Sequence, residues 1–300
     1  MTVRFVRPIS HSAYASRKIA VAALLLFVLA TVGHRFGPLR TPDFVALMLL
    51  SAAIAGIAVP LALMGLMRLW QKGAEGGVAS AQALLYAAVP IAVVGIGAFA
   101  YLTQPALYEV TTDIEDPPTF VAAADYDQEW LAGRAPVTVA GRRSQTAAYP
   151  GLTGRRYEGA LDRVMEGVEA AALSARIVLL KQEGEEPELD EAEEEITVPV
   201  PQNVPVPLQR PGERPLPRDL ASVEETVRPA EDLLVQGETR TLALGLPFDV
   251  VIRLREDEET TSVDIRVASR YGAHDLGMSA AIAEDFLDRL DTELLGIAGG

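Results

Sequence analysis

Three long apolar runs in the first hundred residues constrain the fold more than any other feature of the sequence. The second and third runs, residues 44–67 and 83–102, are 24 and 20 residues long and contain no Asp, Glu, Lys, Arg or His. About 20 apolar residues are enough for a helix to cross the roughly 30 Å hydrocarbon core of a bilayer. Both runs are therefore predicted to be transmembrane helices.

The first run, residues 19–32, is shorter and has two interpretations. Four basic residues precede it, as they would precede the apolar part of a signal peptide, namely Arg4, Arg7, Arg17 and Lys18. However, no clear small-x-small cleavage pattern follows, and two further apolar runs do, which favours a span whose basic ends reach the interface. We expect a membrane anchor over residues 19–103, with spans near 19–33, 44–67 and 83–102.

The basic residues at the ends of these runs predict the orientation. The tail, residues 1–18, carries four Lys or Arg, whereas each of the two following loops carries two. Basic segments stay in the cytoplasm. We therefore expect a multi-pass protein of the cell inner membrane with a cytoplasmic N-terminus and a periplasmic C-terminal domain. The runs hold no charged residue to mark an ion path, so they predict an anchor surrounded by membrane lipids, not a transporter.

The rest of the chain is strongly acidic. Residues 1–100 contain 8 Lys or Arg and 2 Asp or Glu, whereas residues 101–300 contain 18 and 39. Phosphate backbones repel such a domain, so nucleic acid is not an expected partner. The chain has no Cys and only three His, which excludes disulfides, thiolate sites and sites built from several imidazoles. We expect no metal and no cofactor.

Hydrophobic periodicity predicts an α+β outer domain with an antiparallel sheet and flanking amphipathic helices, over residues 104–180 and 220–300. Apolar residues recur at helical spacing in 157–173, and a short apolar strand follows at 176–180. Leu242 and Leu244 alternate with smaller residues, which indicates another strand. The final helix is expected to begin at Ser279 as its N-cap and to end near Gly296.

The clearest element of this domain is a β-hairpin. Alternating apolar residues predict that Leu254 pairs with Val263 and Ile252 with Ile265, with residues 257–260 as the loop. This register places Arg253 opposite Asp264 on the other face of the sheet, as an ion pair between neighbouring strands.

Between the two parts of the domain lies a segment of different composition, residues 181–219. It contains nine acidic residues between Glu183 and Glu195 and then prolines every two to four residues. Segments of this kind bury little apolar surface and extend, so the sequence predicts a disordered insertion.

The stretch SRYGAHDLG, residues 269–277, contains the residue types of a hydrolytic triad in Ser269, His274 and Asp275. Neighbouring His and Asp side chains tend to point apart, and no nucleophile elbow surrounds the serine. The stretch is better interpreted as a turn in which Asp275 caps the next helix. A third interpretation is a binding site. Its candidate residues come from this turn, the polar side of the hairpin and the segment after the third span: Asp113, Arg253, Arg266, Arg270, Tyr271 and His274.

The polar residues after the third span also have more than one interpretation. Thr111, Thr112 and Asp113 offer hydroxyl and carboxylate groups, but the same residue types also form local turns, which we favour. Arg270 is a candidate ion-pair partner for Asp113 or Asp116, and such a pair would fix the domain onto its membrane stalk.

Three motifs occur in order: VTTDIEDPPTF at 110–120, DVVIRLRE at 249–256 and VDIRVASRYGAHDLG at 263–277. With them, residues 105–295 resemble the bacterial domain-of-unknown-function family numbered 1499. The resemblance implies a membrane-associated envelope domain and names no activity. The usual family pattern has an asparagine and an arginine where this chain has Ser279 and Ile282, which weakens any role of the helix start in holding a ligand through a positive charge.

The sequence thus favours a membrane-anchored envelope protein, not an enzyme, whose outer domain binds an envelope protein, a lipid or a small ligand. The alternative is a hydrolase that uses His274 with Ser269 or with an activated water. A purely structural scaffold that assembles through its helices is the third hypothesis.

Overall fold

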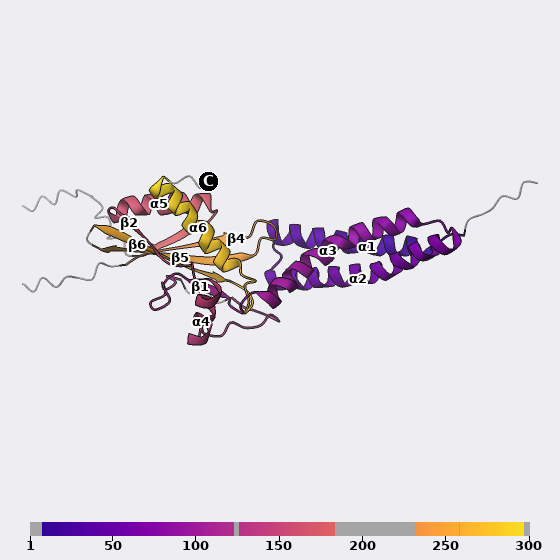
Figure 1. The fold of residues 1–300 in the computed structure, drawn as a ribbon, viewed down its shortest axis with the longest axis horizontal. Helices are drawn as coiled ribbons and strands as arrows, with labels where there is room; N and C mark the ends of the chain where they lie inside the picture. Colours follow the sequence, from indigo (N-terminus) through magenta and orange to yellow (C-terminus); the bar gives the residue numbers. More distant parts are fainter. Residues whose placement is uncertain (1–7, 123–125, 184–231, 258, 297–300) are drawn as a thin grey trace, which may run out of the picture.

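The computed structural model describes residues 8–122, 126–183, 232–257 and 259–296. They form an elongated molecule with a three-helix bundle at one end and an α+β domain at the other (Figure 1). Residues 184–219 of the predicted disordered insertion lie outside the described part. Its first three residues, 181–183, belong to a strand, so the regular structure continues past the predicted boundary.

The bundle consists of α1 (His11–Phe36), α2 (Thr41–Lys72) and α3 (Gly77–Thr103). All three are long and apolar enough to cross a membrane, as the sequence predicted. α1 begins well before its apolar run and includes residues 11–18 of the predicted tail. Ser10 and Glu75 are joined by a backbone hydrogen bond of 3.0 Å, which places the start of α1 and the α2–α3 loop at the same end of the bundle.

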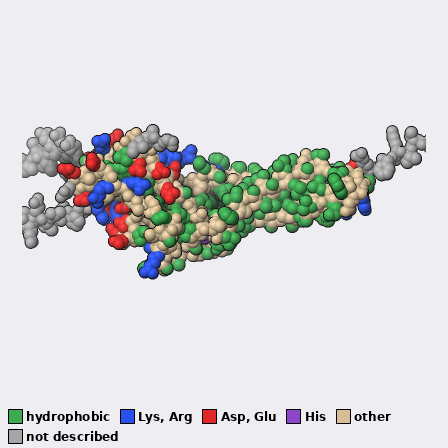
Figure 2. Space-filling view, in the orientation of Figure 1, with side chains coloured by type: hydrophobic (Ala, Val, Ile, Leu, Met, Phe, Trp, Pro, Cys, Tyr) green, Lys and Arg blue, Asp and Glu red, His purple; other side chains and the backbone are tan. Residues whose placement is uncertain are grey.

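Small side chains let the three helices approach closely. The buried interface is formed by alanines, and a Cβ added at Gly65 would lie 2.2 Å from Ser80 Oγ and 2.9 Å from Ala13 Cβ. Small residues at such contacts are typical of helices that pack within a membrane. Large apolar side chains, Leu29 and Ile96 among them, are exposed on the outside of the bundle, and Figure 2 shows the nearly uncharged surface that results.

The α+β domain is built on one antiparallel sheet. Its strands are β1 (Glu109–Thr111), β2 (Arg155–Glu158), β3 (Val178–Glu183), β4 (Leu233–Arg240), β5 (Pro247–Asp257) and β6 (Thr260–Ser269). The order is β1-β6-β5-β4-β3, and β2 also pairs with β6. The hairpin register is confirmed, with Leu254 opposite Val263 and Arg253 opposite Asp264. The loop is shorter than predicted, because Asp257 and Thr260 are themselves paired.

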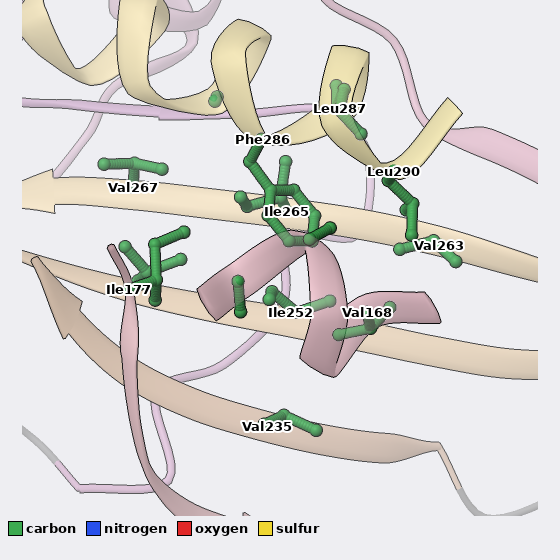
Figure 3. Close-up of a cluster of buried hydrophobic side chains, with 14 of the residues drawn as sticks. Val168, Ile177, Val235, Ile252, Val263, Ile265, Val267, Phe286, Leu287 and Leu290 are labelled. Atoms are coloured by element: carbon green, nitrogen blue, oxygen red, sulfur yellow. The ribbon is translucent and has the colours of Figure 1, made fainter. Parts of the chain in front are cut away.

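One face of the sheet carries the hydrophobic core. α5 (Leu161–Ser174) and α6 (Met278–Leu295) cover it side by side (Figure 1). In Figure 3, Phe286 of α6 lies against Ile265 and Leu290 points toward Val263, while Val168 approaches the sheet from α5. All five side chains are fully or almost fully buried. Full burial of an apolar side chain of this size contributes about 1.5–3 kcal/mol, so this layer holds the domain together.

Three sequence predictions need correction. Leu242 and Leu244 do not belong to a strand: β4 ends at Arg240, and Gly245 with φ 71° closes a turn in which Leu244 packs against the bundle. The helix predicted over 157–173 begins later, at Leu161, because Tyr157 and Glu158 belong to β2, and no pattern in the sequence indicated α4 (Val139–Ala148). Finally, α6 begins at Met278 with Gly277 as N-cap, so the cap predicted at Ser279 was wrong.

Candidate functional site

The second face of the sheet, opposite α5 and α6, carries charged side chains. Strand alternation places Arg253, Asp264 and Arg266 on this face of β5 and β6, because their neighbours Ile252, Val263 and Ile265 fill the core. Asp249 of β5 and Glu238 of β4 lie on it too, in register with each other. We call this surface the polar face.

An irregular segment, residues 112–122 and 126–136, lies across the polar face, and we call it the arm. Gln236 of β4 binds the backbone of Ala122 twice, accepting from its N–H at 2.8 Å and donating to its carbonyl at 3.2 Å. Arg266 donates to the Pro118 carbonyl at 3.0 Å. The arm is therefore held by polar contacts to the sheet and not by an apolar core.

Arg253 is the centre of one charge cluster. Its side chain is only 4% exposed and donates to Asp113 at 2.8 Å, Asp116 at 2.8 Å and Asp264 at 3.1 Å. Asp113 also accepts from two backbone N–H groups of its own turn, so the predicted local turn is confirmed at Asp113, whereas the hydroxyl of Thr112 donates to Asp264 of β6. Because Asp113 and Asp116 belong to the arm, Arg253 fastens the arm to the sheet.

Burial and hydrogen bonding act in opposite directions on this cluster. Burial raises the pKa of Asp113, but the backbone N–H of Asp116 and the Arg253 guanidinium outweigh it and hold that pKa below its usual value. Burial likewise lowers the pKa of Arg253, whereas Asp264 and Asp113 raise it more. Both groups are therefore charged across the physiological pH range.

Two further arginines on the polar face form ion pairs with carboxylates. Arg266 binds Glu109 of β1 at 2.6 Å, and the other oxygen of Glu109 binds Arg142 of α4 at 2.6 Å. Arg270 binds Asp249 at 2.8 Å and also pairs with Glu238. The partner of Asp113 and Asp116 is thus Arg253, and not Arg270 as one alternative from the sequence had it.

Between the arm and these clusters lies a pocket of about 490 Å³, which we call the arm pocket. Its walls contain Tyr108, Phe120 and Arg134 as well as the charged residues Glu109, Asp249 and Arg266. The Phe120 ring lies 4.9 Å from the Arg266 guanidinium. The pocket therefore combines aromatic rings with carboxylate and guanidinium groups.

Two buried polar atoms of this pocket's wall lack a hydrogen-bond partner among the described residues. They are Asp249 Oδ2 and Arg266 Nε. Asp249 itself is 3% exposed. A buried polar atom without a partner costs about 1–3 kcal/mol, and such atoms are rare in stable folds. Two residues that line the pocket thus each carry a polar atom that makes no hydrogen bond within the described part of the chain.

A family model described as a protein of unknown function, DUF1499, matches residues 109–290. The chain belongs to the DUF1499 family. The match begins at β1 and ends within α6, so the α+β domain is the DUF1499 domain and the three apolar helices precede it. Neither the comparison with curated proteins nor the comparison with solved structures gives a match.

In the DUF1499 domain, the stretch 269–277 forms the corner between β6 and α6. Asp275 accepts from the N–H groups of Gly277 at 2.8 Å and Ser279 at 3.2 Å, so it caps α6 as the sequence suggested. Ser269 Oγ donates to the carbonyl of Tyr271, and His274 Nδ1 accepts from the N–H of Leu276. Each candidate triad side chain is thus engaged in its own local contact, and these contacts do not form a relay.

The structure does not bring all the predicted binding residues of the DUF1499 domain together. Arg253 and Asp113 form the arm fastening, Arg266 lines the arm pocket, and Arg270 lies behind that pocket as the partner of Asp249. His274 lies instead at the bundle, with its ring 4.8 Å from that of Tyr101 on α3. Tyr271 packs 5.8 Å from the ring of Tyr126.

Arg266 is the one residue of the arm pocket predicted as a site residue; the other charged and aromatic residues of its wall were not predicted, namely Tyr108, Glu109, Phe120, Arg134 and Asp249. Only Asp249 carried a signal, because its position in the hairpin alternation puts it on the same face as Arg253. Burial, and then the neighbouring Glu109, raise the pKa of Tyr108, so its phenol stays protonated and can donate at neutral pH. Among the described residues, no group of three or more His, Cys, Asp or Glu is placed to hold a metal ion.

Proposed function

We propose that this protein is an inner-membrane binding protein whose DUF1499 domain faces the periplasm and takes a small polar ligand into the arm pocket. The observation that carries the proposal is the arm pocket itself, with Asp249 Oδ2 and Arg266 Nε unpartnered in its wall. Concave sites with a few convergent polar groups between apolar walls are the usual form of small-molecule sites.

The pocket's chemistry indicates the class of ligand. Asp249 offers an acceptor, Arg266 a donor, and Tyr108 and Phe120 offer ring surfaces. A ligand that matches them carries hydroxyl or amino groups on one side and an apolar face on the other, as a sugar or another small polyol does. The lining charges are balanced between Glu109 and Asp249 on one side and Arg134 and Arg266 on the other, which favours a ligand without a large net charge.

The arrangement of the bundle supports the proposed orientation. The start of α1 and the α2–α3 loop share one end, so the basic residues of both act together. Four described basic residues lie at that end, Arg17, Lys18, Arg68 and Lys72, and Arg4 and Arg7 precede them in the sequence. The end that carries the domain has Arg35 and Arg40. The basic end is expected to stay in the cytoplasm.

No contact among the described residues supports the hydrolase alternative. Its candidate nucleophile and base bind the backbone of their own corner, and His274 packs against a membrane helix. A base must lie within hydrogen-bond reach of the nucleophile it activates. We therefore assign the corner a structural role.

The proposal is tested by measuring ligand-induced stabilisation of the full chain in detergent against a panel of sugars and polyols. A ligand present at 100 times its Kd stabilises the folded protein by about 2.7 kcal/mol, which is readily seen as a rise in melting temperature. Phe120→Ala should abolish that rise. Leu173→Ala, which removes an exposed side chain of α5 on the other side of the sheet, is the control and should preserve it. Absence of any stabilising compound, or an equal response in both variants, contradicts the proposal.

A further inference from the structure

A second pocket lies where the domain meets the bundle. The turn after β4 docks onto the end of α1, because His34 Nδ1 contacts the Leu244 carbonyl at 2.8 Å and Arg35 donates to the Thr241 carbonyl at 2.8 Å. Leu244 also packs into the apolar cluster around Phe44 of α2. This turn therefore lies at the level where the apolar helices end, which is the level of the lipid headgroups.

The pocket, about 260 Å³, opens beside this turn, and we call it the junction pocket. Arg176 and Arg240 contribute its positive charges, and both are exposed. Met278 and Ile282 of α6 form an apolar wall, and Leu242 at the rim is 65% exposed. The pocket thus joins two guanidinium groups to an apolar surface at the membrane boundary.

These two arginines differ from most arginines of the domain in their ionic contacts. On the polar face, Arg253 and Arg270 are each held by two or more carboxylates, and Arg266 is held by one, that of Glu109. The side chains of Arg176 and Arg240 make no hydrogen bond or ion pair with any described residue. The one acid of the junction pocket, Asp285, is itself held by Arg289. In a domain with a large excess of acidic residues, two cations are left without a protein counter-charge on the side that faces the bilayer.

The backbone at Arg176 adds a second observation. Its φ is +60°, in the left-handed region that favours glycine. A residue with a side chain held in this region costs of order 1 kcal/mol, and such strain persists where the surrounding structure enforces it. Here the Ile177 N–H binds the Ala172 carbonyl at 2.8 Å, which fixes the turn and directs residue 176 to the junction.

We propose that the junction pocket binds the headgroup of an anionic phospholipid of the adjoining leaflet. Arg176 and Arg240 bind the phosphate, and Leu242 with the apolar wall of α6 contacts the first part of the acyl chains. Guanidinium groups match phosphate oxygens in geometry as well as charge. The site is independent of the arm pocket, which lies on the opposite face of the sheet, and it couples the domain to the lipid composition of its membrane.

The test is native mass spectrometry of the full chain in detergent, titrated with phosphatidylglycerol and, separately, with phosphatidylcholine. The wild type is expected to prefer phosphatidylglycerol. Each arginine near an anionic lipid surface contributes about 1 kcal/mol, or about a 5-fold change in binding, so the double variant Arg176→Gln, Arg240→Gln should lose about 25-fold of that preference. Arg163→Gln makes the same change of charge at an exposed position on α5 away from the bundle and should leave the preference intact.

Three outcomes overturn the proposal. The double variant keeps the preference, the control variant loses as much of it, or inorganic phosphate in excess removes the bound lipid completely. The last result would mean that the pocket takes a soluble phosphate and that the acyl chains add nothing. Both substitutions in the double variant affect exposed side chains, so the fold is expected to remain, and an unchanged melting temperature confirms it.

Discussion

Replacement of Arg253 by methionine is the sharpest perturbation of the contact between the arm and the sheet. The substitution keeps most of the apolar length of the side chain and removes the charge. It leaves Asp113, Asp116 and Asp264 clustered without the guanidinium that lies 2.8–3.1 Å from each of them. Loss of one partner from a buried ion pair costs about 3–5 kcal/mol, because the remaining charges stay uncompensated.

The lower end of that range applies here. Asp116 is 68% exposed, so water solvates it once Arg253 is gone, whereas Asp264 is only 16% exposed and keeps most of the cost. A loss of about 3 kcal/mol lowers the melting temperature by about 6–12 °C for a domain of 150–250 residues. Arg255→Met is the matched control on the same strand. Arg255 is 44% exposed and binds Asp232 at 2.7 Å and Asp116 at 3.3 Å, and exposed pairs of this kind contribute at most about 1 kcal/mol each.

The assay is thermal unfolding of the full chain in detergent, followed by tryptophan fluorescence. The chain has two tryptophans, and Trp130 belongs to the arm, where its indole donates to the Pro42 carbonyl at 3.2 Å. In a Trp70→Phe background, Trp130 alone reports whether the arm is in place. If Arg253→Met lowers the transition no more than Arg255→Met does, the arm is not fastened through Arg253.

The Asp113 carboxylate, the hydrophobic core and the close contact between β3 and β4 each support one further prediction. The pKa of Asp113 is held below its usual 3.8 in the folded state, so its contribution to stability is present above that pH and is lost as the pH falls through the folded-state pKa. Acid unfolding curves should therefore be steeper below about pH 4 in the wild type than in Arg253→Met. Phe286→Ala in the core should cost about 3–5 kcal/mol in denaturant titrations, whereas Leu173→Ala on the exposed side of α5 should cost less than about 1 kcal/mol. Gly237→Ala should cost about 1–3 kcal/mol, because the new Cβ would lie 2.8 Å from the Val178 carbonyl oxygen on β3, and an unchanged denaturation midpoint would contradict that close approach.

The sequence was sufficient wherever local periodicity determines the structure. The apolar runs predicted the three helices, and the alternation around Ile252 and Val263 predicted the β5–β6 register to the residue. The opposition of Arg253 and Asp264 followed from that register alone, and the two side chains do form an ion pair at 3.1 Å. In each case the relevant residues are close in sequence or are related by a short turn.

The sequence was insufficient where contacts join distant segments. Asp113 and Arg253 are 140 residues apart, and no periodic pattern indicates that the arm crosses the polar face. Leu244 alternates like a strand residue, but its contact with the end of α1, more than 200 residues away, draws it into a turn. The arm pocket could not be predicted for the same reason, because its walls come from β1, the arm, β5 and β6 together.

Cysteine labelling determines on which side of the membrane the arm pocket lies, because the native chain contains no cysteine and each introduced thiol is the only one. Thr119→Cys places a thiol at the exposed mouth of the arm pocket, and Trp70→Cys places one at the opposite end of the bundle, where residue 70 is 92% exposed. Each single variant is expressed in a bacterium, and its spheroplasts are treated with a maleimide that does not cross membranes. We expect labelling of residue 119 in intact spheroplasts and of residue 70 only after permeabilisation. Labelling of residue 70 in intact spheroplasts, with residue 119 protected, would place the pocket in the cytoplasm and refute a periplasmic binding domain.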